Sequence, residues 1–452
     1  MDYINHSCND WIGYIKIKIR KNSLNFFLNK KILIYGLGKS GLSTYQFLKN
    51  KNDIFLYDDY QSKIKDKNIK KKIIDFRNIS KVKFDRILLS PGIDINKCKL
   101  SKFLKKNLKI IYSDLDVFYN FYKNDCITIT GTNGKSTTCQ LLFEILSKQK
   151  FDVKLAGNIG IPILSIKNVK KKTLFIIEAS SYQLDYSRLF KSKYAAILNL
   201  SPDHLERHLT LNKYIDAKFK LLENQSKSNF AFVNKNDLLT QRKLKSKKFK
   251  SKIIQVQTKQ DFTNLKNFGN HYFLTETNKE NLSFVLEIIK KWKINKNLLF
   301  KTIENFKGLK YRQQIIYKKN NLMIINDSKS TSFSSSISAL KVNSNIFWLL
   351  GGLHKKNDKF NLSKKYFKNI RAFIYGRNVK FFNKELKGKI KYKNFINLNH
   401  ALKKIFMILK KNKNKPYTIL FSPCAASFDS FNNFEERGFY FNKLINRYLY
   451  GK

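Results

Sequence analysis

Long hydrophobic runs are missing from this sequence of 452 residues. No stretch approaches the ~18 uninterrupted apolar residues that a membrane-spanning helix requires, so we expect no membrane span. The first residues include acidic Asp2 and lack the basic head and apolar core of about 7–15 residues that mark a secretory signal. Together these absences predict a cytoplasmic protein.

Cysteine is scarce and poorly placed for cross-linking. The five cysteines form no CxxC pair, and their number is odd. This pattern excludes a disulfide framework and a cysteine-based zinc site, and it is typical of a reducing compartment.

Acidic residues and arginine are also few. Only 32 Asp and Glu stand against 89 Lys and Arg, which gives a formal net charge of +57, and 11 of the basic residues are Arg. Nucleic-acid surfaces are usually clustered and rich in Arg, whereas these lysines are scattered among Asn, Ile, Phe and Tyr, whose codons are A/T-rich. We attribute the charge to genome composition and expect no nucleic-acid partner. A basic nucleic-acid-binding protein stays open as an alternative, and such a field attracts phosphorylated substrates.

Hydrophobic residues, by contrast, make up 42% of the chain, enough for several cores. Short apolar runs alternate with helix-like stretches, which indicates an α/β fold with parallel sheets and crossover helices. The expected strands cover residues 31–35, 54–57, 86–89, 126–130, 174–177, 194–200, 322–325, 346–350 and 417–421. Residues 235–270 are rich in Lys and only weakly periodic, and no element is assigned there.

A phosphate loop follows the expected strand at 126–130. It reads Gly131-Thr132-Asn133-Gly134-Lys135-Ser136 and leads into a helix-like stretch that reaches about residue 148. Backbone N–H groups and the helix N-terminus can cradle phosphate oxygens, Lys135 would neutralise the β- and γ-phosphates, and the Ser136 hydroxyl would bind Mg²⁺. The loop is a shortened variant, because Ile129 stands where the strict pattern has glycine.

Carboxylate and imidazole groups follow the next two strands. Glu178 closes an apolar strand, where burying a carboxylate is costly without a cation. Mg²⁺ prefers oxygen ligands, so Glu178 is the natural partner of Ser136. Asp203 and His204 lie just beyond the following strand, and a single histidine of this kind is more often structural or on the surface.

A second glycine loop lies near the start of the chain. Gly36, Gly38 and Gly41 match the dinucleotide fingerprint, and the Asp58-Asp59 pair follows 17 to 18 residues after Gly41. Alone, this pattern is compatible with an NAD-dependent dehydrogenase. With two phosphate loops in one chain, one could bind a substrate that carries a diphosphate and the other ATP.

Further strings continue the pattern to the end of the chain. The strings are GLGKSGLS (36–43), SPGI (90–93), TGTNGKST (130–137), GNIG (157–160), EASSYQL (178–184), DHLERH (203–208), NDSKSTS (326–332), LLGG (349–352) and LFSPCAASFDSFNNFEERG (420–438). In this order the chain resembles the ATP-dependent muramyl ligases of peptidoglycan synthesis from about residue 31 onward. The phosphate loop is shared by all of them and by folylpolyglutamate synthases, which stay open as alternatives. The NDSK turn and the last string are particular to the D-glutamate-adding branch.

Two strings depart from the family pattern. TETN at 275–278 stands where the family usually has Gly-x-His-Asn, and SDLD at 113–116 stands for Gly-Asp-hydrophobic-Glu. The first change bears on the adenine contacts, and neither touches the residues expected to transfer phosphate.

The resemblance implies an α/β fold of three domains. These are a Rossmann-like UDP-binding domain at 31–115, a central P-loop ATPase domain with a mostly parallel sheet at 116–310, and a Rossmann-like D-glutamate-binding domain at 311–452, with residues 1–30 as an extension. It implies that ATP phosphorylates the carboxylate of UDP-N-acetylmuramoyl-L-alanine, and that the amine of D-glutamate attacks the acyl phosphate. A monomer is expected.

The resemblance also assigns individual residues. One Mg²⁺ would be held by Ser136 and Glu178, and a second by His204 with a carbamate on Lys218, so that Lys135, His204 and Lys218 form the catalytic set. ATP would contact Gly131 to Thr137 (Gly131, Thr132, Asn133, Gly134, Lys135, Ser136, Thr137), Asn281 at the adenine, Arg312 at the phosphates and Asp327 at the ribose. The UDP-substrate would contact Gly38, Lys39, Ser40, Asp58, Asp59, Ser90, Gly92 and Asn158. D-Glutamate would contact Thr331, Lys355, Ser427 and Phe434, of which Phe434 could equally pack in the core.

Overall fold

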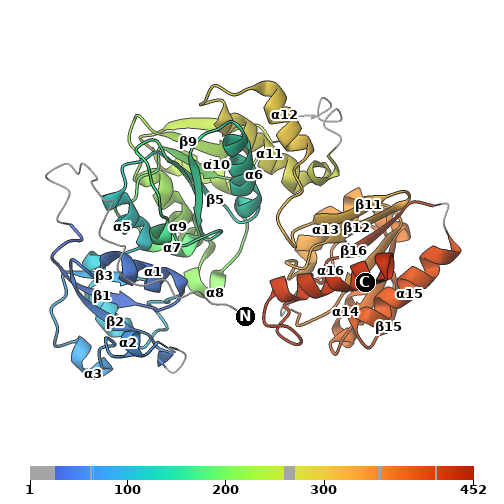
Figure 1. Ribbon diagram of the computed structural model, residues 1–452, viewed down its shortest axis with the longest axis horizontal. Helices are drawn as coiled ribbons and strands as arrows, with labels where there is room; N and C mark the ends of the chain where they lie inside the picture. The colour runs from blue at the N-terminus through green and yellow to red at the C-terminus, as the bar shows by residue number, and fades with distance from the viewer. Residues whose placement is uncertain are drawn as a thin grey trace.

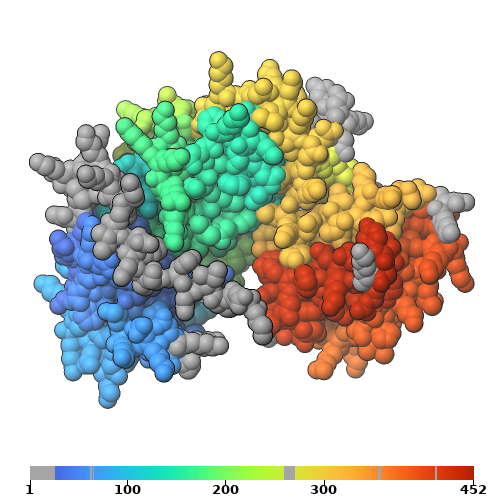
Figure 2. All heavy atoms as spheres, in the orientation of Figure 1, coloured from blue at the N-terminus to red at the C-terminus, as the bar shows by residue number. Residues whose placement is uncertain are grey.

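Three β-sheets follow one another along the chain, each at the centre of a lobe (Figure 1). The computed structural model describes residues 26–61, 64, 66–258, 270–354, 358–412 and 415–451. We call the three parts the N-terminal lobe (26–112), the central lobe (113–304) and the C-terminal lobe (311–451). Figure 2 shows them as successive blocks of colour, with the orange and red C-terminal lobe bordering the yellow end of the central lobe. The expected α/β fold is confirmed.

The N-terminal lobe is built on a parallel sheet of four strands in the order β2-β1-β3-β4. Its elements are β1 (Lys31–Tyr35), α1 (Lys39–Leu48), β2 (Asp53–Tyr57), α2 (Lys67–Lys70), α3 (Phe76–Ile79), β3 (Arg86–Leu89), α4 (Ser101–Lys106), the 3₁₀ turn Leu108–Ile110 and β4 (Ile111–Tyr112). Of the expected extension at 1–30, residues 1–25 lie outside the described part of the chain, and Phe27 is buried in the core of this lobe.

The central lobe holds a parallel sheet of six strands in the order β10-β9-β8-β5-β7-β6. Its strands are β5 (Cys126–Thr130), β6 (Val153–Gly157), β7 (Leu174–Glu178), β8 (Tyr194–Ile197), β9 (Phe230–Asn234) and β10 (Lys252–Val256). Its helices are α5 (Asp114–Phe121), α6 (Lys135–Lys148), α7 (Ser181–Tyr186), α8 (Leu205–His208), α9 (Leu211–Glu223), α10 (Leu238–Ser246), α11 (Glu276–Ile289) and α12 (Lys296–Glu304), with 3₁₀ turns at Ile163–Ser165 and His271–Leu274. Helices α6, α11 and α12 share one core, whereas α5, α7 and α9 share another with the N-terminal lobe.

The C-terminal lobe holds six strands in the order β11-β12-β16-β13-β14-β15. Its strands are β11 (Gln314–Lys319), β12 (Leu322–Asn326), β13 (Ile346–Leu350), β14 (Ile370–Tyr375), β15 (Lys391–Phe395) and β16 (Tyr417–Phe421). Its helices are α13 (Phe333–Val342), α14 (Val379–Leu386), α15 (Leu398–Lys411) and α16 (Phe434–Tyr450), with a 3₁₀ helix at Lys364–Asn369.

The structure corrects two sequence-based expectations and assigns elements to a stretch that the sequence left open. The strand expected at 194–200 ends at Ile197, because the chain then leaves the sheet to contact the phosphate loop. The unassigned stretch 235–270 contains α10 and β10, and residues 259–269 lie outside the described part. The C-terminal sheet is not wholly parallel, because β11 pairs antiparallel with β12 through a tight turn in which Asn320 takes φ +51°.

A buried carboxylate ties α5 to the segment that follows α7 in the central lobe. Asp116, on α5, accepts backbone N–H bonds from Arg188, Leu189 and Phe190 at 2.7–3.2 Å and a hydroxyl bond from Ser187 at 2.9 Å. Its other neighbour is the N–H of Ser113, at the beginning of the same helix. This SDLD string therefore has a structural role, because its last carboxylate satisfies donors that no other group reaches.

Neither membrane spans nor disulfides are found within the described residues. None of their helices combines the length and the apolarity needed to cross a bilayer. Cys98, Cys126, Cys139 and Cys424 are all free.

Candidate active site

The phosphate loop leaves the carboxyl end of β5 and enters α6, as expected from the sequence. Gly134 is the residue before α6 and has φ +84°, a conformation that favours glycine. A Cβ at this position would lie 2.0 Å from Oδ1 of Asn281, which is fully buried on α11. The loop can therefore approach the predicted adenine residue this closely only because position 134 has no side chain.

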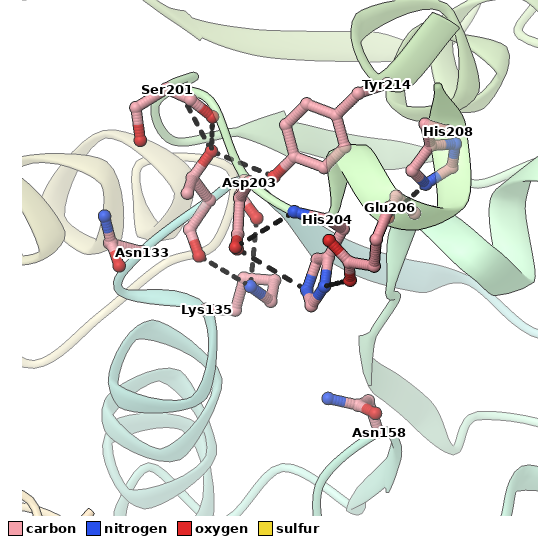
Figure 3. Close-up of polar contacts among 12 residues, drawn as sticks. Asn133, Lys135, Asn158, Ser201, Asp203, His204, Glu206, His208 and Tyr214 are labelled. Atoms are coloured by element: carbon pink, nitrogen blue, oxygen red, sulfur yellow. Dashed lines mark hydrogen bonds and ion pairs between the residues drawn. The ribbon is translucent and has the colours of Figure 1, made fainter. Parts of the chain in front are cut away.

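Asn199 ties the loop to the end of β8. Its carbonyl accepts the N–H of Thr132 at 2.9 Å, and its Oδ1 accepts the N–H of Asn133 at 2.8 Å. The Thr132 hydroxyl lies 3.2 Å from the carbonyl of Ser201 and 3.0 Å from the hydroxyl of Tyr214 (Figure 3). These bonds satisfy the N–H groups of Thr132 and Asn133 and fix the loop against the end of β8, so the N–H groups left for a phosphate are those at the start of α6.

A half-buried lysine, Lys135, and a buried one, Lys218, share one carbonyl of the loop. Lys135 Nζ donates to Gly131 O and Thr132 O, each at 2.9 Å, and Lys218 Nζ, from α9, donates to Gly131 O at 2.8 Å. Burial lowers the pKa of Lys135, while Glu178 raises it. Burial and the neighbouring charge of Lys135 hold the pKa of Lys218 well below its usual value. The site therefore contains one ammonium facing the phosphate cradle and a second amine that is easily neutral.

Glu178 is the candidate cation ligand at the end of β7. Its side chain is 1% exposed, and Oε1 accepts a bond from Asn158 Nδ2 at 2.8 Å. Oε2 is buried and has no hydrogen-bond partner among the described residues. Such an orphaned carboxylate oxygen fits a cation. Mg²⁺ fits this single carboxylate, because it needs few protein ligands when phosphates supply the others.

His204 lies at the rim of the site rather than in it. It precedes α8, its side chain is 45% exposed, and its ring nitrogens lie 3.4 Å from Asp203 and 3.6 Å from Glu206 (Figure 3). The buried histidine of the DHLERH string is His208, which bonds to Ser181 at 3.0 Å. The geometry brings Lys135, Lys218 and Glu178 together, whereas His204 is separately paired with carboxylates.

The predicted adenine residue has an unsatisfied acceptor. Asn281 Nδ2 bonds to Oδ1 of Asn278 at 3.4 Å, and Oδ1 of Asn281 is buried without a partner among the described residues. An exocyclic amine of a base could supply the missing donor. Despite its altered sequence, the TETN string supplies Asn278 as the neighbour that orients Asn281.

Charged residues of the C-terminal lobe face the phosphate loop. Arg312 acts electrostatically on Lys135, and Lys329 interacts with both Lys135 and Glu178. Burial lowers the pKa of Lys329 to about 8. Asp327 is buried, and its oxygens accept the N–H of Gln313 at 3.0 Å and the hydroxyl of Ser422 at 2.8 Å.

One of the predicted D-glutamate residues, Phe434, is the first residue of α16. The ring of Phe434 is half-buried and faces Lys329 Nζ, whose distance to the ring centroid is 4.4 Å. Ser427 is buried, and Thr331 is half-buried just before α13. Lys355 lies outside the described residues.

The N-terminal glycine loop is held by its own carboxylates. Asp58 accepts the N–H groups of Leu37 and Tyr60 at 2.6 and 2.8 Å. Asp59 accepts the Tyr35 hydroxyl at 2.7 Å, and Ser90 donates to the Gly36 carbonyl at 2.6 Å. Gly38 and Lys39 are exposed at the N-terminus of α1, with Ser40 half-buried beside them and Gly92 exposed nearby. This loop leaves the N-terminus of α1 open to an anion.

Sequence reasoning missed several contributors. The residues that contact predicted site groups but were not assigned are Asn199, Tyr214, Asn278 and Lys329, and Arg437 acts electrostatically on Asp327. Asn199 could have been found as a polar residue after a strand, and Lys329 as part of the NDSK turn. Tyr214 and Arg437 carry no local signal.

Comparisons with known proteins identify the family of the chain. Residues 30–112 match the Mur ligase MurD-like N-terminal domain, and residues 129–299 match the Mur ligase middle domain. The chain is 34% identical to the UDP-N-acetylmuramoylalanine–D-glutamate ligase of Rickettsia prowazekii, over 94% of this chain and 100% of that protein. It is 35% identical to the ligase of the same name from Buchnera aphidicola subsp. Schizaphis graminum, over 93% and 99%.

Solved structures support the fold. MurF from Thermotoga maritima in complex with ADP superposes with a TM-score of 0.56 at 13% identity, over 94% of this chain and 99% of that one. MurC from the same organism gives a TM-score of 0.53 at 16% identity, over 94% and 100%. The chain therefore belongs to the Mur ligases, in the family of UDP-N-acetylmuramoylalanine–D-glutamate ligases.

Proposed function

We propose that this chain is an ATP-dependent amide-bond ligase that adds D-glutamate to UDP-N-acetylmuramoyl-L-alanine in peptidoglycan precursor synthesis. Its family membership supports both the reaction and the substrates. The observation that carries the proposal in this chain is the charge pair at the phosphate loop: Glu178 is buried with one orphaned carboxylate oxygen, and its charge raises the pKa of the half-buried Lys135, whose ammonium bonds to the loop.

The carboxylate of the UDP-substrate is a poor electrophile until one of its oxygens becomes a leaving group. In the proposed first step that oxygen attacks the γ-phosphorus of ATP, the bond to the β-phosphate oxygen breaks, and ADP departs. The D-glutamate amine then attacks the carbonyl carbon of the acyl phosphate, loses a proton, and expels phosphate. Both steps bring anions together, so the loop N–H groups and Lys135 must offset the charge that develops.

Mg²⁺ is the cofactor that the residues fit. Ser136 and Glu178 would hold it beside the loop, and when bound it neutralises charge on the phosphates. Asn158 keeps Glu178 in place through its hydrogen bond to Oε1. We place a second Mg²⁺ nearer His204, on the basis of the family pattern.

Lys218 is proposed to carry a carbamate. CO₂ adds only to a neutral amine. The addition, with loss of a proton, gives a carbamate anion that can bind a metal, in place of the positive charge that a lysine usually carries. Lys218 is 2% exposed, its amine lies beside that of Lys135, and burial favours its neutral form, which supports this chemistry.

The remaining parts of the UDP-substrate, ATP and D-glutamate would bind to residues of different lobes. The UDP moiety would occupy the loop at Gly38, Lys39 and Ser40 with Ser90 and Gly92, and Asp58 and Asp59 would shape that loop. Adenine would meet Asn281, the phosphates Arg312, and the ribose Asp327. D-Glutamate would lie near Thr331, Ser427, Phe434 and Lys355. We further propose that the enzyme acts as a monomer in the cytoplasm, without a nucleic-acid partner.

The test is phosphate release from the purified protein with Mg²⁺-ATP and UDP-N-acetylmuramoyl-L-alanine, each amino acid being supplied singly. We expect release with D-glutamate and little with L-glutamate or other amino acids. Lys135→Ala should abolish turnover with an unchanged circular dichroism spectrum. Equal release with L-glutamate would defeat the specificity, and an active Lys135→Ala protein would refute the role of the loop.

The carbamate has a test of its own. Lys218→Ala should lose activity and recover part of it when short carboxylic acids are added, because they can replace the carbamate. Full activity of Lys218→Ala without additive would remove Lys218 from the site.

A further inference from the structure

A continuous chain of hydroxyl groups crosses the core of the C-terminal lobe. It begins at Asp327, after β12, and runs through Ser422, Ser336 and Ser330 to Ser335 in the first turn of α13. The successive oxygen–oxygen distances are 2.8, 2.5, 2.8 and 2.7 Å, all within hydrogen-bond length. The first four groups are buried and the last is exposed. We call the four serines the serine chain.

Each serine has one proton to donate, so the bonds of the chain depend on one another. When Asp327 is ionised, Ser422 donates to it, and each following serine keeps its bond in the chain by donating toward Asp327. The carbonyl of Ser332 is a longer alternative acceptor for Ser330, at 3.4 Å. When Asp327 is protonated and donates, the whole sequence reverses, and Ser335 gives its proton to the carbonyl of Ser332, 2.6 Å away. The serine chain therefore has two orientations that interchange as a unit.

A second neighbour of Ser336 does not break this dependence. Cys424 Sγ lies 2.9 Å from Ser336 Oγ, but sulfur is a weak acceptor, and the thiol has the carbonyl of Ser422 within 3.4 Å as an acceptor of its own. Ser336 is therefore left with Ser422 and Ser330 as its hydroxyl partners in the chain.

Both forms of Asp327 are accessible near neutral pH. Burial raises the pKa of Asp327 to about 7, and the Ser422 hydroxyl, the Gln313 N–H and the charges of Arg312 and Arg437 oppose that rise. A ribose hydroxyl that donates to Asp327 would favour the ionised form and so fix one orientation. At the other end, Ser335 Oγ accepts the N–H of Ser332 at 3.3 Å, in the turn that directly follows Thr331.

We propose that the serine chain couples the nucleotide pocket energetically to the amino-acid pocket, so that occupancy of one changes the affinity of the other. The assignment of the two pockets to Asp327 and Thr331 rests on the proposed function. The serines are positioning residues: they contact neither ligand, and they transmit the direction of a hydrogen bond. Such a two-state element biased at both ends is the physical requirement for coupling.

The test measures coupling without turnover, on the full chain with Mg²⁺, UDP-N-acetylmuramoyl-L-alanine and ADP in place of ATP. Calorimetry gives the Kd of ADP with and without saturating D-glutamate, and by linkage the same ratio describes the effect of ADP on D-glutamate. For the wild type we expect the Kd values of ADP with and without D-glutamate to differ by about fivefold, which is the effect of one neutral hydrogen bond. Ser336→Ala and Ser330→Ala break different links, and each should bring the ratio close to one.

Two matched variants separate coupling from stability. Ser334→Ala removes an exposed hydroxyl from the same turn outside the chain and should keep the wild-type ratio, as should Ser336→Thr, which retains the hydroxyl. If Ser336→Ala does not fold, Ser330→Ala carries the test, because position 330 precedes the helix. A wild-type ratio of one, or an unchanged ratio in Ser330→Ala, would overturn the inference. Failure of the wild type to bind ADP and D-glutamate at all would instead count against the proposed function.

Discussion

Replacing glycine by alanine at either of two positions in the N-terminal glycine loop separates the role of the loop in packing from its role in ligand binding. A Cβ at Gly41 would lie 1.8 Å from the Gly36 carbonyl oxygen and 2.7 Å from Ser90 Oγ. A Cβ at Gly38 would meet nothing within 4 Å, and Gly38 has an ordinary φ of −73°. We therefore expect Gly41→Ala to disturb the fold and Gly38→Ala to disturb only the ligand.

The cost of Gly41→Ala follows from what must move. The new methyl group would overlap the Gly36 carbonyl by more than an ångström, so α1 must shift away from β1, and such overpacking costs about 1–3 kcal/mol. The methyl group would also crowd Ser90 Oγ and disrupt its 2.6 Å bond to Gly36, worth about 0.5–1.5 kcal/mol. The sum is about 1.5–4.5 kcal/mol. For Gly38→Ala the change in stability should stay within about 0.5 kcal/mol.

Hydrogen exchange at the amides of β1 and β3 reports the opening free energy of this lobe directly. Gly41→Ala should lower it by the amount above. Gly38→Ala should leave it unchanged and weaken binding of the UDP-substrate at least about tenfold, because its methyl group would occupy the place where backbone and diphosphate meet. Equal exchange in wild type and Gly41→Ala, or equal destabilisation by both variants, would refute this explanation of the loop.

Two titrating groups give further predictions. Burial raises the pKa of Asp114 from 3.8 to about 6, so the stability from its extra proton is present below pH 4 and is lost as pH rises through 6. Asp114→Asn should therefore raise the free energy of unfolding at pH 7 by up to about 3 kcal/mol and flatten its pH dependence between 4 and 6, as urea denaturation will show; an unchanged profile would contradict the assignment. Lys329, with a pKa of about 8, is charged below that pH, and we expect activity to fall as pH rises through 8. Lys329→Met should have lower activity at pH 7, and its activity should not fall further as pH rises through 8. If the fall persists in Lys329→Met, another group causes it.

The sequence predicted those strands and loops whose buried residues and functional groups lie together within one short stretch. The strands β1, β3, β5, β13 and β16 have the bounds expected from their apolar runs. The phosphate loop also lies where its flanking strand and helix predict, because its glycines and lysine are required locally.

The end of strand β8 could not be predicted from the apolar pattern. Leu198 and Leu200 are buried, so the hydrophobic run continues past the last residue of the strand. The backbone nevertheless leaves the sheet after Leu198 bonds to Thr130, because Asn199 must satisfy the N–H groups of the loop. That requirement comes from a segment 66 residues away and has no local signature.

Long-range contacts explain the remaining gaps in the site. The choice between the two histidines of DHLERH depends on which one α8 turns inward, and it is His208 that meets Ser181. Arg437 is 1% exposed and donates to the carbonyls of Ser328 and Ala425, 109 and 12 residues away. Residue type and spacing cannot predict such partners.

The central claim is that ATP activates the carboxylate of the UDP-substrate by taking it into an acyl phosphate. Its most direct test uses UDP-N-acetylmuramoyl-L-alanine with both carboxylate oxygens replaced by ¹⁸O, turned over with Mg²⁺-ATP and D-glutamate. Because the attacking oxygen leaves with the phosphoryl group, each phosphate released should carry one ¹⁸O atom. Phosphate free of ¹⁸O, released in step with the amide product, would contradict the account.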